Sequence, residues 1–468
     1  MSEPRDPAET GVDEPTWLTP DGSTVSIEPV RSASTRRRLV LGGVALVVVI
    51  AMGLGVALRG PAPEPPGPTG PSAPAAAAHD RIAVVAPDGT LSIVDRTGAP
   101  VRRLPSDATA LRFPAFSPDG DFLAAIGATT ERSSVIVFDV RLGVVDADAE
   151  APRIVYASPE RGVIYLSWAP DGQRIAFLTG GPGTLALRVS PAGGGRKDHV
   201  VIEGQPLYWD WVDASSLVVH GGGAGASAFV QELGIDGATA IERASFPGIF
   251  QAPAVSADGR YLAFVAGRPG VAGTLVIEER DGPARSAVVD LRAASFGWSP
   301  VRADLAFIDG GGAAGPSLGP LRVGDAATGA TRTVLDAAVA AFFWSPDGAS
   351  IAALTLEAAD GGNIASAVGA DAGTVAAIPG IHVRLIVVDP ADGTRSFERI
   401  VALSDVFEQQ LLPFFDQYAK SHRLWSADSR AVVLPLVDAE GGAHLTVIPV
   451  DGGPEVDVGP GVLGFWSP

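Results

Sequence analysis

The sequence predicts an all-β fold built from eight copies of one repeating unit, and three observations lead to this prediction. The 468 residues include 57 glycines and 39 prolines, a content that favours many turns joining short strands over long helices. One turn motif recurs along residues 80–468. A short apolar strand follows nearly every copy of that motif.

The turn motif consists of an aromatic or apolar residue, then Ser or Ala, Pro or Ala, Asp and Gly, as in the WSPDG string that begins at Trp344. Proline fixes φ, aspartate hydrogen-bonds its own backbone, and glycine takes the positive φ that closes a tight hairpin. Clear, weaker and truncated copies begin at Phe116, Trp168, Trp211, Val255, Trp298, Trp344, Trp425 and Trp466.

The strand after the motif, for example Ile175–Leu178, is apolar at successive positions. Continuous apolarity predicts a strand that is covered on both faces. Units of about 40–50 residues made of such strands predict a β-propeller, in which four-stranded blades stack around an axis. We expect eight blades, with seven as the alternative count. A β-solenoid is the other architecture to consider, but its rungs would be shorter.

The two ends of this region each hold part of a unit. The turn Asp95–Gly98 has no motif upstream, and the motif at Trp466 has no strand downstream. We therefore expect Val462–Trp466 to form the innermost strand of the blade that contains Ile82–Val85. This pairing would close the ring and remove an open strand edge.

The repeated strings resemble the TolB-like propeller repeat, a relative of the WD repeat whose mark is W-S-P-D-G followed by an apolar strand. The resemblance covers roughly residues 80–468 and is specific for the fold. Proteins similar in this repeat include a partner-binding envelope protein and the propellers of prolyl oligopeptidase-like enzymes. This chain departs from both, because it has neither the α/β domain of the former nor sequence for the hydrolase domain of the latter. No functional residue is carried over.

A membrane anchor is predicted ahead of the repeats. Residues 39–58 contain no charged side chain, and twenty helical residues span about 30 Å, the thickness of a bilayer core. Arg36–Arg38 precede this segment, so the positive-inside rule places residues 1–38 in the cytoplasm as a disordered tail. Residues 59–79 form a Pro/Ala-rich linker. We expect a single-pass protein of the cell membrane whose propeller, residues 80–468, is periplasmic or extracellular.

A cleaved signal peptide is the alternative to the anchor. The apolar stretch of such a peptide would be only about 7–15 residues long, shorter than residues 39–58. The length of the segment therefore favours an uncleaved transmembrane helix.

Composition excludes several classes of function. The chain has 53 acidic and 34 basic residues, a formal net charge of −19, and this argues against a nucleic-acid partner because phosphates would be repelled. The absence of cysteine excludes disulfides, thiolate metal sites and a cysteine nucleophile.

No catalytic, cofactor-binding or metal-binding residue is predicted. Gly315–Gly319 matches G-x-S-x-G, but it lies in a glycine-rich loop without the strand and helix that a nucleophile elbow needs. The acidic run Asp146–Glu150 resembles the start of a calcium loop but lacks the later Gly and Glu of an EF-hand; a solvated turn is favoured over a loose calcium site. The six histidines have no ligand spacing. Whether the protein is an enzyme stays open, and a protein without its own chemistry is favoured.

Two insertions interrupt the repeat, at about residues 356–382 and 404–421. Because alternate loops of antiparallel strands emerge on the same side, both are expected to protrude from one face of the ring. In the second insertion apolar residues recur at helical spacing, with Asp405 and Glu408 placed as a capping box. Pro413 would cost about 3 kcal/mol inside a helix, so we expect the helix to break there.

The second insertion also supplies the candidate partner-binding residues. Two interpretations are weighed equally: these side chains bind a protein or peptide partner, or they plug the gap between neighbouring blades. The candidates are Phe407, Leu411, Phe414, Phe415 and Tyr418.

The function predicted from the sequence is a binding platform for a protein, a peptide or an envelope polymer, carried on a monomeric propeller and without a cofactor. One alternative is an enzyme whose active site lies in the central funnel, where residues from different blades converge. The other is a sensor that relays ligand binding to the cytoplasmic tail.

Overall fold

The structure is a computed structural model. It describes Trp17–Leu18, Thr24–Val25 and residues 80–468, with gaps at 106, 109, 142–150, 182, 196, 223–227, 238–239, 245–250, 268–272, 283–284, 292–294, 311–317 and 359–380. The chain divides into two compact units, Met1–Gly53 and Leu54–Pro468. In the first unit, β1 (Trp17–Leu18) pairs with β2 (Thr24–Val25).

The predicted anchor of residues 39–58 and the linker of residues 59–79 lie outside the described residues. Among the residues that are described, no helix has the length and apolar character needed to cross a membrane.

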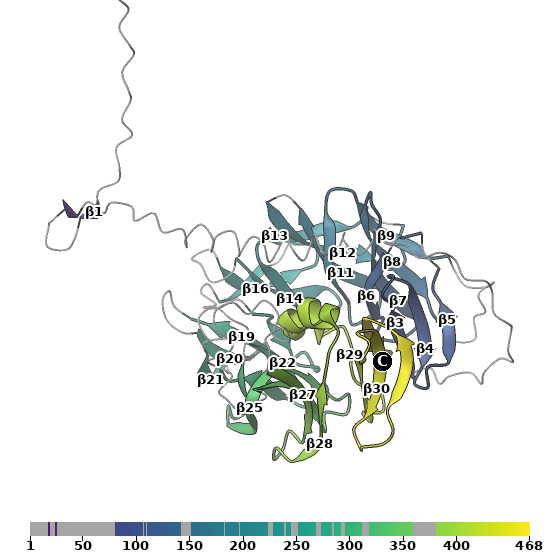
Figure 1. The fold of residues 1–468 in the computed structure, drawn as a ribbon. Coiled ribbons are helices and arrows are strands. Elements are labelled where there is room, and N and C mark those ends of the chain that lie inside the picture. Colours follow the sequence, from purple (N-terminus) through teal and green to yellow (C-terminus); the bar gives the residue numbers. More distant parts are fainter. Residues whose placement is uncertain are drawn as a thin grey trace, which may run out of the picture. The chain divides into compact units, whose positions relative to one another are not determined.

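The second unit is nearly all β, as predicted. Its described residues form seven antiparallel sheets, most of them four-stranded, and successive sheets follow the chain (Figure 1). This pattern is that of a β-propeller. The first four sheets contain β32 (Leu463–Trp466), β3 (Arg81–Val85), β4 (Leu91–Asp95) and β5 (Pro100–Arg103); β6 (Ala110–Phe116), β7 (Phe122–Ala128), β8 (Ser133–Asp139) and β9 (Arg153–Ser158); β10 (Gly162–Trp168), β11 (Arg174–Gly181), β12 (Thr184–Pro191) and β13 (His199–Gly204); and β14 (Leu207–Asp213), β15 (Ser216–Gly221), β16 (Phe229–Gly234) and β17 (Ala240–Ala244).

The remaining three sheets differ in size. Four, seven and three strands build them in turn. They contain β18 (Ala254–Val255), β19 (Tyr261–Ala266), β20 (Gly273–Glu279) and β21 (Arg285–Leu291); β22 (Phe296–Trp298), β23 (Asp304–Ile308), β24 (Gly319–Asp325), β25 (Thr331–Trp344), β26 (Ile351–Ala358), β27 (Ile381–Val388) and β28 (Arg395–Val401); and β29 (Ala431–Val437), β30 (Ala443–Pro449) and β31 (Val456–Pro460).

The seven-stranded sheet is continuous because of one long strand. β25 has 14 residues: its beginning pairs with β24 and its end pairs with β26. Val339 in the middle pairs with Gly319 on one side and with Thr355 on the other. The four-strand pattern therefore runs through this sheet twice, with β25 shared between the two halves.

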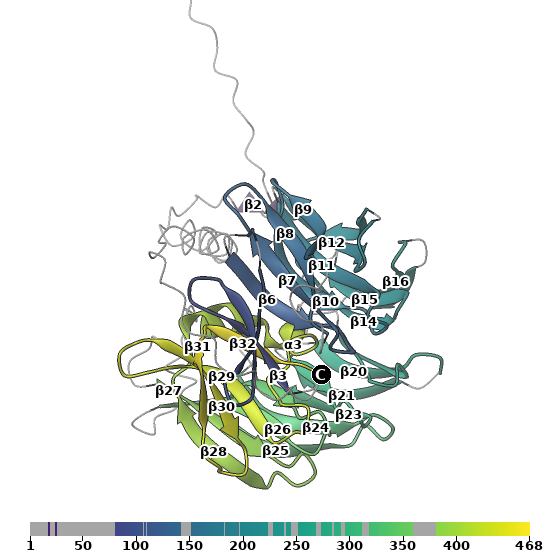
Figure 2. The ribbon, with the colours of Figure 1, turned by 90° about the vertical axis from the view of Figure 1, so that its right-hand side faces the viewer.

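The C-terminal strand closes the first sheet, as the sequence predicts. β32 pairs antiparallel with β3, from Ile82 opposite Trp466 to Val85 opposite Leu463 (Figure 2). The pairing extends to Ser467, whose backbone N–H donates to the carbonyl of Arg81 at 2.8 Å. Trp466 is 1% exposed and packs in one apolar cluster with residues of β3, β4, β29, β30 and β31. The last strand thus joins the first and last sheets of the unit.

The turn motif has the predicted geometry. In the turn that follows β18, Gly259 takes φ +71°, the Ser256 hydroxyl donates to Asp258 at 2.6 Å, and Asp258 accepts the Arg260 amide at 3.1 Å. The same serine–aspartate pair recurs at Ser345 and Ser426. Local turn chemistry therefore explains the last four residues of the motif.

The aromatic first position of the motif has a different role, which links neighbouring sheets. The indole N–H of Trp425 donates to the carbonyl of Phe343 on β25, at 2.9 Å. Equivalent bonds of 2.8 and 3.1 Å run from Trp168 to Ala115 and from Trp298 to Ala254. A further bond of 3.0 Å, from Trp344 to Gly297, joins the two halves of the seven-stranded sheet. Each of these carbonyls belongs to the residue before the aromatic position of the previous unit.

We expect Trp425→Phe to cost about 1–2 kcal/mol more than Trp466→Phe in the free energy of unfolding, measured by urea denaturation. Trp425 and Trp466 are 2% and 1% exposed, so the two changes remove similar buried volume. Only the first leaves a buried carbonyl without its donor, because the Trp466 indole nitrogen has no hydrogen-bond partner among the described residues. Equal losses would mean that the indole hydrogen bond does not hold the sheets together.

Candidate functional site

The insertion of residues 404–421 forms a short, irregular helical segment, which we call the plug. It consists of one π-helical turn, η3 (Phe407–Leu411), one 3-10 turn, η4 (Leu412–Phe414), and one α-helical turn, α3 (Phe415–Tyr418). The predicted break at Pro413 is confirmed. The predicted capping box is wrong: no side chain caps this segment in that way, and Ser404 holds its start, with its hydroxyl oxygen accepting the Phe407 amide at 3.3 Å.

The plug lies among the inner strands of the unit rather than outside it. The ring of Tyr418 stacks on Phe113 of β6 at 4.8 Å and meets Tyr165 of β10 edge-on at 5.1 Å. Phe415 packs edge-on against Phe342 and Phe343 of β25. The predicted protrusion of this insertion is therefore wrong, because its aromatic side chains pack against strands of several sheets. The segment lies among those strands in Figure 1.

Polar side chains fasten the plug at its other contacts. The Gln417 amide accepts the backbone N–H of Trp209 at 3.0 Å and donates to the carbonyl of the same residue at 2.9 Å. Asp416 accepts the Ala252 amide at 3.3 Å, and burial raises the pKa of its carboxyl to about 6. Lys420 pairs with Asp210 at 2.8 Å. The plug and His422, the residue that follows it, contact β6, β10, β14, β25 and β32, which are strands of five different sheets.

Four of the five predicted partner-binding residues are buried in this packing. Phe407, Leu411, Phe415 and Tyr418 are between 0% and 5% exposed, so they do not reach solvent in this structure. Phe414 is half-buried beside Tyr208. Of the two interpretations that the sequence left equal, this placement favours the plug over a partner-binding surface.

A hydrogen-bonded chain links the end of the plug to two sheets. Burial lowers the pKa of His422 to about 4, so its imidazole is neutral, and its Nε2–H donates to the Phe113 carbonyl at 3.2 Å. The Nδ1 atom then accepts the Ser421 hydroxyl at 2.7 Å, and Ser421 accepts from Tyr165 at 2.8 Å. A serine on a histidine nitrogen is the geometry of an activated nucleophile. Here the imidazole is 2% exposed and too weakly basic for that role, so the chain is structural.

The plug also contains a half-buried carboxyl whose ionisation opposes folding. Burial, and then the charge of Asp405, raise the pKa of Glu408 to about 7, above its unfolded value of about 4.3. A raised folded pKa means that the stability this group contributes is present below pH 4 and is lost as the pH rises to 7. We expect Glu408→Gln to raise the free energy of unfolding by roughly 1 kcal/mol at pH 8, discounted for partial exposure, and to change it little at pH 4.

Chemical denaturation at both pH values checks this prediction. Asp405→Asn is the control, because it removes only the weaker of the two causes and should give a smaller gain at pH 8. An equal effect of Glu408→Gln at both pH values would contradict the assignment.

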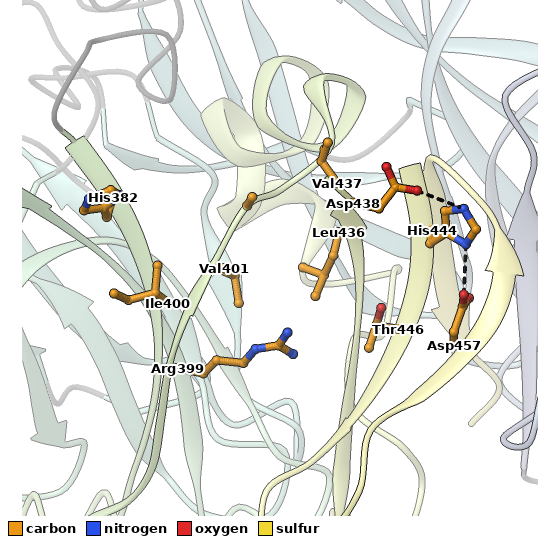
Figure 3. A pocket seen from close by; sticks show the side chains of 11 residues that line it. His382, Arg399, Ile400, Val401, Leu436, Val437, Asp438, His444, Thr446 and Asp457 are labelled. Carbon is orange, nitrogen blue, oxygen red and sulfur yellow. Dashed lines mark hydrogen bonds and ion pairs between the residues drawn. The ribbon is translucent and has the colours of Figure 1, made fainter. Parts of the chain in front are cut away.

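A cleft of about 520 Å³ opens between β28 and the sheet β29–β31 (Figure 3). β28 contributes Arg399, Ile400 and Val401 to one wall, and Leu436 of β29 is on the other. The walls are joined where Val437 donates to the Ala402 carbonyl at 2.9 Å. An ion pair between Arg399 and Glu455 also connects them. The two walls therefore meet at these contacts, and the cleft is open to solvent beyond them.

His444 and two carboxylates line one wall of the cleft. Its Nδ1 lies 2.9 Å from Asp457 and its Nε2 lies 3.4 Å from Asp438 (Figure 3). The second oxygen of Asp438 accepts the Gly442 amide in the turn between β29 and β30, at 2.7 Å. Within the described residues, no group of three such side chains is placed to hold a metal ion.

The sequence reasoning missed this cleft, and the other candidate motifs stay untested. Asp438 resembles the turn aspartates of every other unit, and His444 was one of six scattered histidines. The only signal was the polar pair His444 and Thr446, which alternates along β30 and so faces one side. Of Gly315–Gly319 only the last two residues are described, and Asp146–Glu150 lies outside the described residues.

Comparison with known proteins bears on the fold alone. No family model and no curated protein matches the chain. The chain is similar to the solved structure of dihydro-heme d1 dehydrogenase NirN in complex with DHE, with a TM-score of 0.50 and 16% identity over 85% of this chain and 75% of that one. The fold is a β-propeller. The similarity to NirN is one of fold alone, because the identity is under 25%.

Two TolB structures are also similar to the chain, at lower scores. TolB from Acinetobacter baumannii has a TM-score of 0.38 and 16% identity, and the match covers 69% of this chain and 63% of that one. The protein from Agrobacterium tumefaciens described as a TolB has a TM-score of 0.34 and 19% identity over 58% of this chain and 95% of that one.

Proposed function

We propose that this protein is an eight-bladed propeller on a single-pass anchor, residues 39–58, and that it acts outside the cytoplasm as a binding platform for a protein, a peptide or an envelope polymer. Five four-stranded sheets supply one blade each, and the seven-stranded sheet supplies two through the shared β25. The sheet β29–β31 supplies the eighth. Its missing first strand is replaced by residues around Trp425, which bridges to Val432.

The packing of the plug is the observation that favours a binding platform over an enzyme. An active site in the funnel would need side chains from several inner strands to converge on an open space. Here Tyr418, Gln417 and Phe415 pack against those strands. In the nearby Ser421–His422 pair, the imidazole is buried. Among the described residues, the surfaces left for a ligand include the cleft and the outer strands.

Thiol labelling tests the proposed topology, because the chain has no cysteine of its own. Val301, 57% exposed, becomes a reporter of the propeller as Val301→Cys, and Ser32→Cys reports the N-terminal tail. We expect a membrane-impermeant maleimide to label Val301→Cys in intact spheroplasts and Ser32→Cys only after lysis. The reverse result would overturn the orientation derived from Arg36–Arg38.

Affinity capture tests the binding function. The full chain, solubilised in mild detergent and tagged at its N-terminus to leave β32 free, is expected to retain a discrete protein, peptide or polymer from an envelope extract. Recovery of nothing above the background of the tag alone would reject the binding platform.

A further inference from the structure

We propose that the plug is a pH-dependent latch, which is docked among the inner strands while the Asp416 carboxyl is protonated and whose docking weakens when this carboxyl ionises. The proposal concerns a movement within the protein and does not depend on the binding function proposed above. Three features lead to it: the burial of Asp416 between the plug and the surrounding strands, the engagement of the neighbouring cation by another group, and the absence of the plug from the strand ladders.

Asp416 is buried where the plug meets the chain ahead of β18. It is 9% exposed, and among the described residues its carboxyl oxygens accept main-chain amides, those of Ala252 at 3.3 Å and Gln417 at 3.0 Å. A carboxylate that leaves water for such a place loses much of its hydration, and hydrogen bonds from neutral amides replace only part of it. The docked plug therefore favours the neutral carboxyl. The raised pKa of Asp416, about 6, agrees with this.

The groups that face Asp416 leave its charge largely uncompensated. Lys420 is the cation whose charge reaches it, but the Nζ atom of Lys420 lies 2.8 Å from a carboxyl oxygen of Asp210 on β14. β14 also presents Tyr208, and burial, followed by the charge of Asp416, raises the pKa of this phenol, so the phenol is neutral. The chain ahead of β18 contributes a main-chain amide, and β25 contributes phenylalanine rings to the same helical turn.

The plug can leave the inner strands without breaking a strand pairing. Its turns, residues 407–418, lie between β28 and Trp425 and belong to no ladder of the described strands. No side chain caps η3, η4 or α3. Segments of this kind open locally at a lower free energy than core strands. Opening uncovers rings that the plug covers, such as Phe113 and Tyr165, so the latch controls access to the inner strands.

The direction of the pH dependence follows from the two states of Asp416. An aspartate in water has a pKa of about 3.9, whereas the docked carboxyl has a pKa of about 6. Because the docked value is the higher one, docking is strongest below pH 4 and weakens as the pH rises through 6. Burial raises the pKa of Glu408 as well, so Glu408 acts in the same direction. Glu408→Gln therefore serves as the background in which Asp416 is tested alone.

Hydrogen–deuterium exchange of the full chain in detergent, followed by mass spectrometry, tests the latch. The exchange rate of a peptide that spans residues 405–421, divided by the rate of the same peptide when unfolded at that pH, gives the ratio of open to docked plug. In the Glu408→Gln chain we expect this ratio to be about tenfold or more higher at pH 7.5 than at pH 4.5. Adding Asp416→Asn, which keeps the side chain neutral, should hold the ratio near its pH 4.5 value at both pH values.

Two controls separate the latch from a general loosening of the fold. Peptides from β11 should show no such rise, and Asp392→Asn, which changes an exposed aspartate in the turn between β27 and β28, should leave the rise unchanged. A ratio that is equal at both pH values in the Glu408→Gln chain would overturn the proposal. So would a rise that persists after Asp416→Asn. A rise of the same size in the β11 peptides would also reject it, because the plug would then open only when the strands unfold.

Discussion

Deletion of residues 462–468 is expected to abolish the folded monomer and to cause aggregation. The deletion removes β32, and with it Phe465 and Trp466, each 1% exposed. A buried aromatic that is lost costs about 3–5 kcal/mol, so the two together approach the whole stability of a typical domain, about 5–15 kcal/mol. The deletion also leaves β3 as an open edge that can pair with other molecules.

Size-exclusion chromatography and thermal melting check this prediction. Trp466→Ala should lower the free energy of unfolding by about 3–5 kcal/mol while leaving a monomer. Removal of Pro468 alone is the control and should cost far less than the full deletion, because β32 ends at Trp466 and keeps its pairing with β3. A deletion variant that stays monomeric and melts with the parent would show that β32 does not hold the ring closed.

Replacing Tyr418 by alanine is expected to lower the free energy of unfolding by about 3–5 kcal/mol. The change empties the space between Phe113 and Tyr165, and the surrounding strands come from different sheets, which limits how far they can collapse. Phe414→Ala in the same segment should cost about 1 kcal/mol, because that side chain is only half-buried.

Urea denaturation measures both changes, and capture of the envelope partner by the folded fraction separates stability from binding. The plug interpretation requires that Tyr418→Ala loses stability and that its folded fraction still captures the partner. A melt equal to that of the parent together with lost capture would restore the partner-binding interpretation of the aromatic residues.

The features of the fold that depend on local chemistry were predictable. The positive φ of Gly259 and the break at Pro413 follow from the properties of single residues. The pairing of β32 with β3 followed from counting, because the two ends of the repeat region hold complementary parts of one unit. The buried strands were marked by apolar runs such as Ile175–Leu178, which are 0–4% exposed.

The position of the plug could not be predicted, because its contacts join residues far apart in the sequence. Gln417 is 208 residues from Trp209, to which it makes both of its side-chain bonds. The spacing of Phe407, Leu411 and Tyr418 would be the same whether these side chains were buried within the protein or bound a partner. The hydrogen bonds of the tryptophan indoles could not be predicted for a related reason. Their acceptors are main-chain carbonyls, which every residue has, so the sequence does not identify them.

The cleft could not be predicted from the sequence, because the repeat that indicates the fold also makes Asp438 resemble the turn aspartates of the other units. Asp438 caps a turn as the aspartates of other units do, and only its second oxygen, directed at His444, distinguishes it. Its partner Asp457 lies on a different strand. The combination depends on the register of β29, β30 and β31, which the sequence does not specify.

The closing pair has a consequence for the connectivity of the ring. Because the Ser467 amide bonds to the Arg81 carbonyl at 2.8 Å, the two chain ends of the propeller meet within one sheet, and a short loop could join them. New termini could then be opened at a turn such as the one at Gly259, giving a circular permutant with the same contacts. In this sense the sheets form a closed cycle, and the structure does not make any one of them the first. The first strand of the propeller begins beside the end of the last one, so a force applied to the chain ahead of β3 would act directly on the β3–β32 pair.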